Sequence, residues 1–302
     1  MTNETYKSCT LCMRNCAKDR ERSLGFCKMP ATPYVTRAAL HMWEEPVISG
    51  TRGSGTIFFS GCSLGCVFCQ NREISRSVAG EKTDAQRLSQ IMLRLQQSGA
   101  HNINFVTPTH YAPTVREAVL LSRKAGLSVP IVYNTGGFDT PETIRSLSGI
   151  VDVYLPDYKF YTAKSAKKYA NAPAYPDNIR KIIAEMVTET GVPVLNTEGV
   201  LEKGVVVRIL LLPGHVAEAK LTVKYLYETY GNGIFFSLMS QYTPMPDMPS
   251  PLSRRVTKQE YRELVDYAER LGVTNAFVQD ESSASEIYIP SFDGSGVSLI
   301  ES

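Results

Sequence analysis

Short apolar runs alternate with amphipathic segments along most of this 302-residue chain. The segment that follows Thr83 places Leu88, Ile91 and Leu95 on one face of a helix, because residues three and four positions apart share a helical face. The apolar runs are rich in Val, Ile and Phe, which is typical of buried strands. They occupy residues 56–61, 102–107, 130–134, 151–156, 204–213 and 233–239, with a shorter run at 275–279. The pattern predicts six repeats of a strand followed by a helix.

The boundaries of the predicted helices carry capping signals. A Thr followed three residues later by Glu or Gln forms a capping box, and a Thr before Pro is an N-cap before a proline at the first helical position. A glycine favours the left-handed residue that ends many helices. Helix starts are predicted at Thr83, Thr114, Thr140, Asp177 and Thr257, and helix ends near Gly126, Gly191, Gly231 and Gly272.

Alternation of strands and helices predicts an α/β fold in which helices cover a parallel sheet. Six units are fewer than a complete TIM barrel has, so a partial (β/α)6 barrel is expected, with a doubly wound sheet as the alternative. In either fold the functional site lies at the carboxyl ends of the strands. Three units are predicted: a cysteine-rich segment at 1–50, the barrel at 51–280, and a C-terminal tail at 281–302 that packs on the barrel.

Composition and charge exclude some partners. The hydrophobic share of 43% and the charged share of 21% are ordinary for a globular protein, and a net charge of +2 is too small to attract nucleic acid. No apolar run approaches the ~20 residues of a membrane span. The start, MTNETYKSCT, lacks an apolar signal segment, so a cytoplasmic protein without a membrane or nucleic-acid partner is expected.

Three cysteines, Cys62, Cys66 and Cys69, lie within SGCSLGCVFCQN (60–71), directly after the first predicted strand. Three thiols cannot all pair as disulfides, and they fall short of the four ligands that structural zinc needs. They suit a [4Fe-4S] cluster in which three irons bind thiolate and the fourth iron stays open to a reacting molecule. Gly61 and Gly65 would let the backbone wrap such a cluster closely.

A second group of cysteines, Cys9, Cys12, Cys16 and Cys27, lies near the start of the chain. Clustered cysteines without a signal peptide are more typical of metal sites than of disulfides. Four thiolates could close a structural zinc site, and they could equally hold a second Fe-S cluster. Their spacing does not decide between zinc and Fe-S.

The Cys-x3-Cys-x2-Cys spacing, with Phe68 before the last cysteine, resembles that of the radical S-adenosylmethionine (SAM) enzymes, over roughly residues 50–280. Within that superfamily the chain resembles the pyruvate formate-lyase activating enzymes, which act on glycyl radical enzymes. Four segments carry this likeness: FCQN (68–71), VYNTGG (132–137), LPDYK (155–159) and VVVRILLLPG (205–214). The four-cysteine start, CTLCMRNC with GFC following, resembles a subgroup of activating-enzyme-like proteins.

The resemblance implies a [4Fe-4S] cluster on Cys62, Cys66 and Cys69 with SAM on its open iron, so these cysteines are the expected catalytic residues. Two places depart from the family. The place of its Gly-Gly-Glu stretch, which contacts the SAM amino group, reads VTPTH (106–110), and Asn134 stands where the family has an aspartate that helps to hold a monovalent cation. The expected cofactor-binding residues are Asn71, Thr107, Thr109, Asn134, Asp157, Lys159, Arg208 and Gln241, and His110, His215 and Tyr242 are further candidates that follow predicted strands.

The implied reaction is reductive cleavage of SAM to a 5′-deoxyadenosyl radical, which takes a hydrogen atom from a glycine of a partner glycyl radical enzyme. A flavodoxin or ferredoxin would suit as the low-potential electron donor. Two alternatives stay open. One is a radical SAM enzyme that acts on a small molecule or another residue, in a closed pocket under the proline-rich loop at 241–256. The other is a non-catalytic Fe-S or zinc scaffold.

Overall fold

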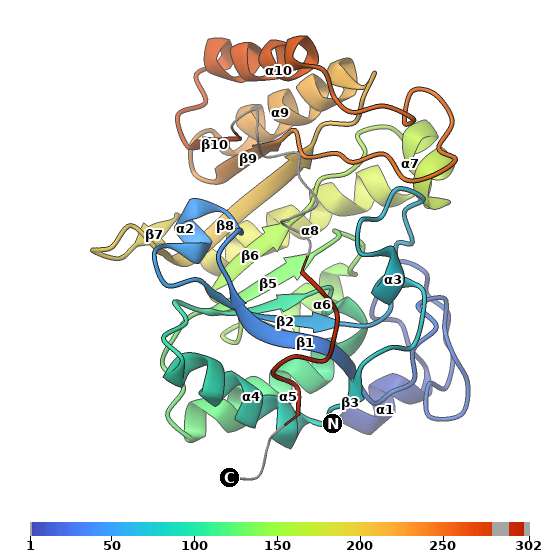
Figure 1. Cartoon of the computed structure of the whole chain (residues 1–302), viewed down its shortest axis with the longest axis vertical. Helices are drawn as coiled ribbons and strands as arrows, with labels where there is room; N and C mark the ends of the chain where they lie inside the picture. The colour runs from blue at the N-terminus through green and yellow to red at the C-terminus, as the bar shows by residue number, and fades with distance from the viewer. Residues whose placement is uncertain (1, 280–289, 299–302) are drawn as a thin grey trace.

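The structure is a computed structural model that describes residues 2–279 and 290–298, and a mostly parallel sheet runs through it (Figure 1). Its strands lie in the order β10-β9-β8-β6-β5-β4-β2-β1-β3, and β7 pairs with β8 outside this order. The strands are β1 (Tyr34–His41), β2 (Ser54–Phe59), β3 (Glu81–Lys82), β4 (Ile103–Val106), β5 (Ile131–Thr135), β6 (Val153–Pro156), β7 (Val194–Leu195), β8 (Leu201–Leu210), β9 (Phe235–Met239) and β10 (Ala276–Val278).

Helices connect most of these strands. The longer ones alternate with the strands from β4 onward, and short helices flank β2 on both sides. The helices are α1 (Thr2–Lys7), α2 (Pro46–Ser49), α3 (Arg72–Ser75), α4 (Ala85–Gln97), the 3₁₀ turn η1 (Thr109–Tyr111), α5 (Ala112–Lys124), α6 (Pro141–Arg145), α7 (Ala163–Ala170), α8 (Tyr175–Thr190), α9 (Val216–Tyr230) and α10 (Lys258–Leu271).

The strand order distinguishes between the two predicted architectures. From β2 to β10 the parallel strands follow one another in chain order, so the described crossovers all advance in one direction. A doubly wound sheet would reverse this order at a switch point, whereas a barrel does not. Figure 1 accordingly shows α4, α5, α8, α9 and α10 on the outer side of the strands. The predicted partial α/β barrel is confirmed.

Three described strands, β1, β3 and β7, were not predicted, and β1 is the longest of them. β1 lies within the segment assigned to the cysteine-rich head, yet it pairs antiparallel with β2 and extends the sheet. The described part of the C-terminal tail packs on it: the Ala38 amide donates to the Ser295 carbonyl at 2.9 Å, and the Gly294 amide donates to the Thr36 carbonyl at 2.9 Å. The sheet therefore begins at Tyr34. Tail residues 281–289 and 299–302 lie outside the described part of the chain.

Two predicted helix starts are confirmed in detail. The Thr140 hydroxyl accepts a hydrogen bond from the Thr143 amide at the start of α6. Thr257 and Glu260 form the predicted capping box of α10, which Gly272 ends in the left-handed conformation. Local sequence determines these ends because the cap and its partner are only three residues apart.

Three other predicted starts were wrong by one to three residues, because the observed N-caps are Asp84, Tyr111 and Ala174. Asp84, not Thr83, caps α4 by accepting from the Arg87 amide. The helix α5 begins at Ala112, so Thr114 lies inside it, and its hydroxyl instead contacts the Tyr6 hydroxyl at 2.8 Å. The helix α8 begins at Tyr175, before a proline, which places Asp177 within the first turn.

The short helix α2 closes the amino-terminal end of the barrel. Its residues Val47 and Ile48 are buried inside the ring of strands. They pack against apolar side chains of β5, β6, β8 and β9, which are Val132, Val153, Leu155, Leu201, Val206 and Phe235. The barrel interior is therefore solid at this end and can hold a site only toward the carboxyl ends of its strands.

The helix α7 was not predicted and gives the β6–β8 crossover two helices in place of one. Among the described helices, none combines the length and the apolar character that crossing a bilayer demands.

Candidate functional site

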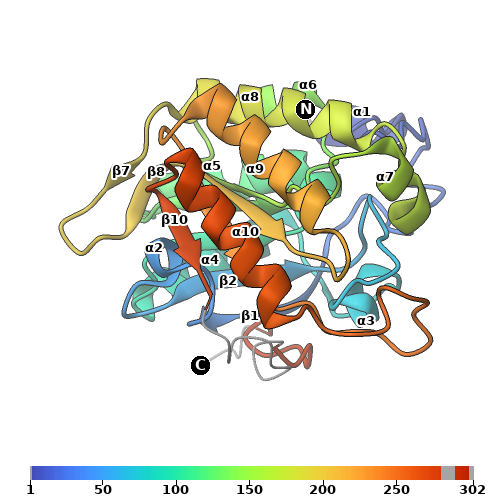
Figure 2. The ribbon, with the colours of Figure 1, turned by 90° about the horizontal axis from the view of Figure 1, so that it is seen from above.

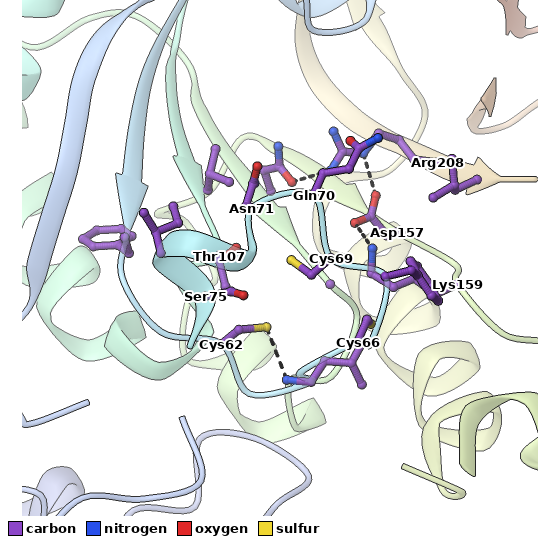
Figure 3. Close-up of a pocket in the computed structure, with 18 of the residues that line it drawn as sticks. Cys62, Cys66, Cys69, Gln70, Asn71, Ser75, Thr107, Asp157, Lys159 and Arg208 are labelled. Carbon is purple, nitrogen blue, oxygen red and sulfur yellow. Dashed lines mark hydrogen bonds and ion pairs between the residues drawn. The ribbon is translucent and has the colours of Figure 1, made fainter. Parts of the chain in front are cut away.

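The three cysteines after β2 surround a cavity of about 210 Å³ at the carboxyl ends of the strands (Figure 3). Cys66 is buried, and Cys62 and Cys69 are partly exposed. The opposite wall is formed by polar side chains from β5, β6 and β8, with Asp157, Lys159 and Arg208 among them. The structure therefore brings the three cysteines to the same cavity as the predicted residues Arg208 and Gln241, which are distant in the sequence.

Two glycines shape the cysteine loop. Gly61 and Gly65 adopt left-handed conformations, with φ of +82° and +69°. A Cβ at Gly61 would approach the Cys27 carbonyl oxygen to 2.8 Å, and a Cβ at Gly65 would meet the ring of Phe26 at 3.4 Å. The N-terminal head thus packs directly on this loop, and glycine is required where the two segments meet.

Arg14 fixes the cysteine loop to the head. Its Nε donates to the Ser63 carbonyl at 3.0 Å, and its Nη2 donates to the Leu64 carbonyl at 2.9 Å. The same guanidinium donates to the Ala170 carbonyl at the end of α7 and lies over the ring of Phe26, 3.7 Å from its centroid. One side chain therefore ties together the head, the loop and α7.

The donor set suits an iron–sulfur cluster better than a single ion. In the part of the chain that the structure describes, no three Cys, His, Asp or Glu side chains gather closely enough to hold one metal ion. A [4Fe-4S] cluster needs no such convergence, since each of its irons takes one thiolate. The Leu64 amide lies 3.4 Å from the sulfur of Cys62, as expected for a loop that donates to a thiolate. Cys62, Cys66 and Cys69 therefore fit the cluster.

Burial raises the pKa of both Cys62 and Cys66, and the positive charge of Lys159 opposes that rise for each. Burial thus favours the protonated form of these two thiols. Binding of iron would displace the protons of these thiols, because cysteine coordinates a metal as the thiolate.

Arg208 and Lys159 converge on one carboxylate. Arg208 Nε lies 2.7 Å from Asp157 Oδ1, and Lys159 Nζ lies 2.6 Å from Asp157 Oδ2. Burial alone would raise the pKa of Asp157, but Arg208 and Lys159 outweigh it and lower that pKa. Burial opposes the charge of Lys159 too, yet Asp157 raises its pKa. All three side chains are therefore held in their charged forms.

Arg208 has two further partners deeper in the barrel. Its Nη2 donates to Asn134 Oδ1 at 2.6 Å, and its Nη1 lies 3.2 Å from Glu44 Oε2. Asn134 also donates to Glu44 Oε1 at 3.3 Å, as does Asn104 at 3.2 Å. The guanidinium thus uses its planar fork on three side chains at once.

A second, larger cavity of about 600 Å³ adjoins the first. It lies between the two edges of the open barrel, and we call it the lateral cleft. One edge contributes His41, Trp43 and Glu45 from the end of β1 and beyond, and the other contributes β10. Residues that line both cavities are Gln70, Asn71, Val106, Asn134, Arg208, Met239 and Gln241. The two cavities therefore share a wall and form one continuous site.

Four more predicted residues lie as follows. Asn71 and Gln241 line both cavities, and Thr107 lines the cysteine cavity. Thr107 adopts a left-handed conformation with φ of +59°, and its amide donates to the Asn134 carbonyl. Thr109 lines neither cavity. It is the first residue of the 3₁₀ turn η1, and its buried hydroxyl contacts that of Thr135 at 3.2 Å.

The further candidates have structural roles. His110 is buried, with Nε2 2.7 Å from the Ser60 carbonyl oxygen, and burial lowers its pKa to about 3. His215 contacts the Tyr169 hydroxyl at 3.1 Å and does not line either of the two cavities. Tyr242 donates to the Leu252 carbonyl and packs edge-on against Phe68.

Sequence reasoning missed Glu44 and Glu45. Both carboxylates point into the barrel from the loop between β1 and α2, and both are at least nine-tenths buried. Their only signal is an acidic pair before Pro46 and the apolar Val47 and Ile48. That signal gains meaning only when β1 is recognised as a strand of the barrel.

The head cysteines lie near one another. Cys9, Cys12 and Cys27 are buried, and Arg20 Nη1 approaches the sulfur of Cys9 to 3.7 Å. A Cβ at Gly25 would lie 3.6 Å from the sulfur of Cys16 and 3.8 Å from that of Cys27, so both sulfurs face this glycine. A second metal site here, zinc or Fe-S, stays a prediction.

Comparison with known proteins gives one family. The sequence model of the Radical SAM superfamily matches residues 56–226. The uncharacterized protein MJ0674 of Methanocaldococcus jannaschii is 28% identical over 279 residues, which cover 88% of this chain and 75% of that protein.

Solved structures share the fold at low sequence identity. A radical SAM methyltransferase from Sphaerobacter thermophilus matches 74% of this chain with a TM-score of 0.52 and 17% identity, and the match covers 66% of its length. HydG, a maturase of the [FeFe]-hydrogenase, matches 76% of this chain with a TM-score of 0.50 and 14% identity, over 52% of its length. The chain thus spans two thirds or less of these two proteins, and the likeness concerns the barrel.

Proposed function

Because this chain belongs to the radical SAM superfamily, we propose that it cleaves SAM reductively and directs the resulting radical to a glycine in a partner glycyl radical enzyme. The family implies a [4Fe-4S] cluster and SAM. One observation carries the proposal: the cysteine cavity is continuous with a lateral cleft that lies between the edges of the barrel. A chain segment from another protein can reach a radical site through such a cleft.

A bound, reduced cluster would supply the one electron needed for reductive cleavage of SAM, the chemistry that would allow hydrogen-atom abstraction from the substrate. The protein's own residues bind and orient. Cys62, Cys66 and Cys69 would hold the cluster. Lys159 and Arg208 present positive charge to the cavity, which suits the carboxylate of SAM. Asp157 keeps both cations in place.

The position of the proline-rich loop favours a peptide over an enclosed small molecule. The loop at 241–256 lies beside α3 (Figure 2) and contacts the cysteine loop, where the Gln70 side chain donates to the Gln241 carbonyl at 2.9 Å. Among the described residues of this loop, Gln241 alone lines the lateral cleft. The loop at 241–256 therefore covers the cluster end of the site, and its described residues beyond Gln241 do not line the lateral cleft.

SAM cleavage tests the reaction. The protein would be reconstituted with iron and sulfide without oxygen, reduced with dithionite and mixed with SAM, and 5′-deoxyadenosine would be measured by chromatography. We expect product from the unmodified protein and none from Cys66→Ala. A well-formed cluster that yields no 5′-deoxyadenosine would contradict the proposed reaction.

Deuterium transfer tests the target. A candidate glycyl radical enzyme would be labelled with deuterated glycine and incubated with the reduced protein and SAM. Deuterium in 5′-deoxyadenosine, together with a glycyl radical signal in the partner by electron paramagnetic resonance, is the expected result. Cleavage of SAM without deuterium transfer would count against that partner and favour a small-molecule substrate.

A further inference from the structure

The carboxyl group of Glu45 is buried in the wall of the lateral cleft without a full set of partners. Glu45 is 8% exposed and lines the cleft. The Ser237 hydroxyl and Glu44 contact the carboxyl group. Its Oε2 atom, however, has no hydrogen-bond partner. A buried carboxyl oxygen without a hydrogen-bond partner is costly, so its presence beside a cavity indicates that a ligand supplies the partner.

The charges around Glu45 do not balance. Asp157, Glu44 and Glu45 supply three carboxyl groups, whereas Lys159 and Arg208 supply two cations. Both cations are already engaged: Lys159 contacts Asp157, and Arg208 spans Asp157 and Glu44. Glu45 is therefore the carboxyl group left without a direct cationic contact in this network.

A second unsatisfied acceptor lies close by. Asn104 donates to Glu44 at 3.2 Å through Nδ2, but its own Oδ1 atom is buried without a partner. Glu45 and Asn104 thus flank the same carboxylate, and each leaves an oxygen free. Of these two unpartnered oxygens, the one on Glu45 belongs to a residue that lines the cleft, and such an acceptor is the complement of a group with N–H bonds.

We propose that the lateral cleft binds a cationic nitrogen group of the substrate, and that Glu45 pairs with it. This inference rests on the proposed function, and under it the group is an Arg or Lys side chain that neighbours the target glycine. A guanidinium or ammonium group would neutralise Glu45 and supply the missing donors. The pairing would also position the substrate, because Glu45 lies on the rigid junction of β1 and α2.

Matched peptides test the charge preference. Arginine and citrulline have nearly the same shape, but citrulline is neutral. Acetylated, amidated peptides with glycine beside arginine or beside citrulline would be titrated by calorimetry into the full chain loaded with cluster and SAM. We expect the arginine peptide to bind at least about tenfold more tightly. A third titration, with n-butylguanidinium, separates a peptide from a free small cation, which would bind as tightly as the peptide if it were the natural ligand.

Two variants locate the effect. Glu45→Gln keeps the shape of the side chain and removes its charge, so the preference for arginine should fall below about threefold. Glu198→Gln is the matched control, since Glu198 is 49% exposed, pairs with Arg52 and does not line either cavity. It should retain the full preference. Thermal melts of both variants would confirm that they fold.

The outcomes separate this inference from the proposed function. Equal affinity for the two peptides, no binding of either, or a preference that persists in Glu45→Gln would overturn the role of Glu45. SAM cleavage by the unmodified protein is measured independently. If cleavage occurs without a charge preference, the proposed reaction stands and this inference fails. If the preference is found without cleavage, the inference stands and the reaction fails.

Discussion

At the scale of single residues, the site depends on how Arg208 distributes its hydrogen bonds. Its Nε contacts Asp157 beside the cysteine cavity, and its Nη atoms contact Asn134 and Glu44 in the lateral cleft. Burial lowers the pKa of a guanidinium, but Asp157 and the two glutamates outweigh it and raise the pKa of Arg208. The Arg208 side chain therefore fixes the positions of polar groups in both cavities relative to one another.

Replacing Arg208 with Met should destabilise the fold strongly. The change would leave Asp157 and Glu44 buried without this cation, and breaking a buried ion pair costs about 3 kcal/mol or more. Anaerobic urea unfolding would measure the loss. Arg145→Met is the matched control, because Arg145 is 47% exposed and its pairs with Glu142 and Glu185 should contribute less than about 1 kcal/mol. Equal losses in the two variants would contradict this account of Arg208.

The pH dependence of stability should reveal Glu45. Burial raises its pKa to about 7 from an ordinary 4.5; Arg208 opposes this rise and Glu44 adds to it. Between these pH values the folded protein keeps a proton that the unfolded chain releases, so the free energy of unfolding falls as the pH rises from 4.5 to 7. Urea unfolding at pH 5 and pH 7 should show a fall about 1–3 kcal/mol larger in the unmodified protein than in Glu45→Gln. Identical falls would show that Glu45 ionises normally.

At the scale of elements, the cysteine loop is defined by what packs against it. β2 delivers the loop to the carboxyl end of the barrel, and the head and α7 hold it there through Arg14. Phe68 packs inward against Phe160, Tyr169 and Tyr242, each about 6 Å away between ring centroids. The loop is therefore preformed by contacts that do not involve the cysteine side chains.

Removing the Arg14 contacts should loosen the cluster. Arg14→Met keeps much of the apolar stem but loses the hydrogen bonds to the Ser63 and Leu64 carbonyls. We expect reconstituted protein to release iron to a chelator several-fold faster, which absorbance would follow. Arg22→Met provides the control, since Arg22 is 88% exposed and contacts only Asp19 at 3.6 Å. A release rate unchanged in Arg14→Met would show that the cysteines alone hold the loop.

At the scale of the whole molecule, the six main β/α units could be predicted because each carries a local apolar period. The strand β1 could not be predicted, because the polar and apolar residues of YVTRAALH alternate only weakly. Its position in the sheet is determined by its antiparallel pairing with β2. The cysteine loop could be predicted from its spacing and its place after a strand, and Asp157, Lys159 and Arg208 from the resemblance of their segments to the activating enzymes. Glu44 and Glu45 could not, because only the tertiary fold brings them beside Arg208.

The closed floor of the barrel has a kinetic consequence. Val47 and Ile48 close the amino-terminal end of the barrel interior, so this end offers no exit. The cysteine cavity and the lateral cleft share a wall. Under the proposed function, a segment of the partner protein bound in the cleft would lie between the spent cofactor and one exit from the site. Its departure would then set the pace of repeated turnover: each encounter with a partner would yield a burst of a single 5′-deoxyadenosine, and the next would wait for the partner to leave.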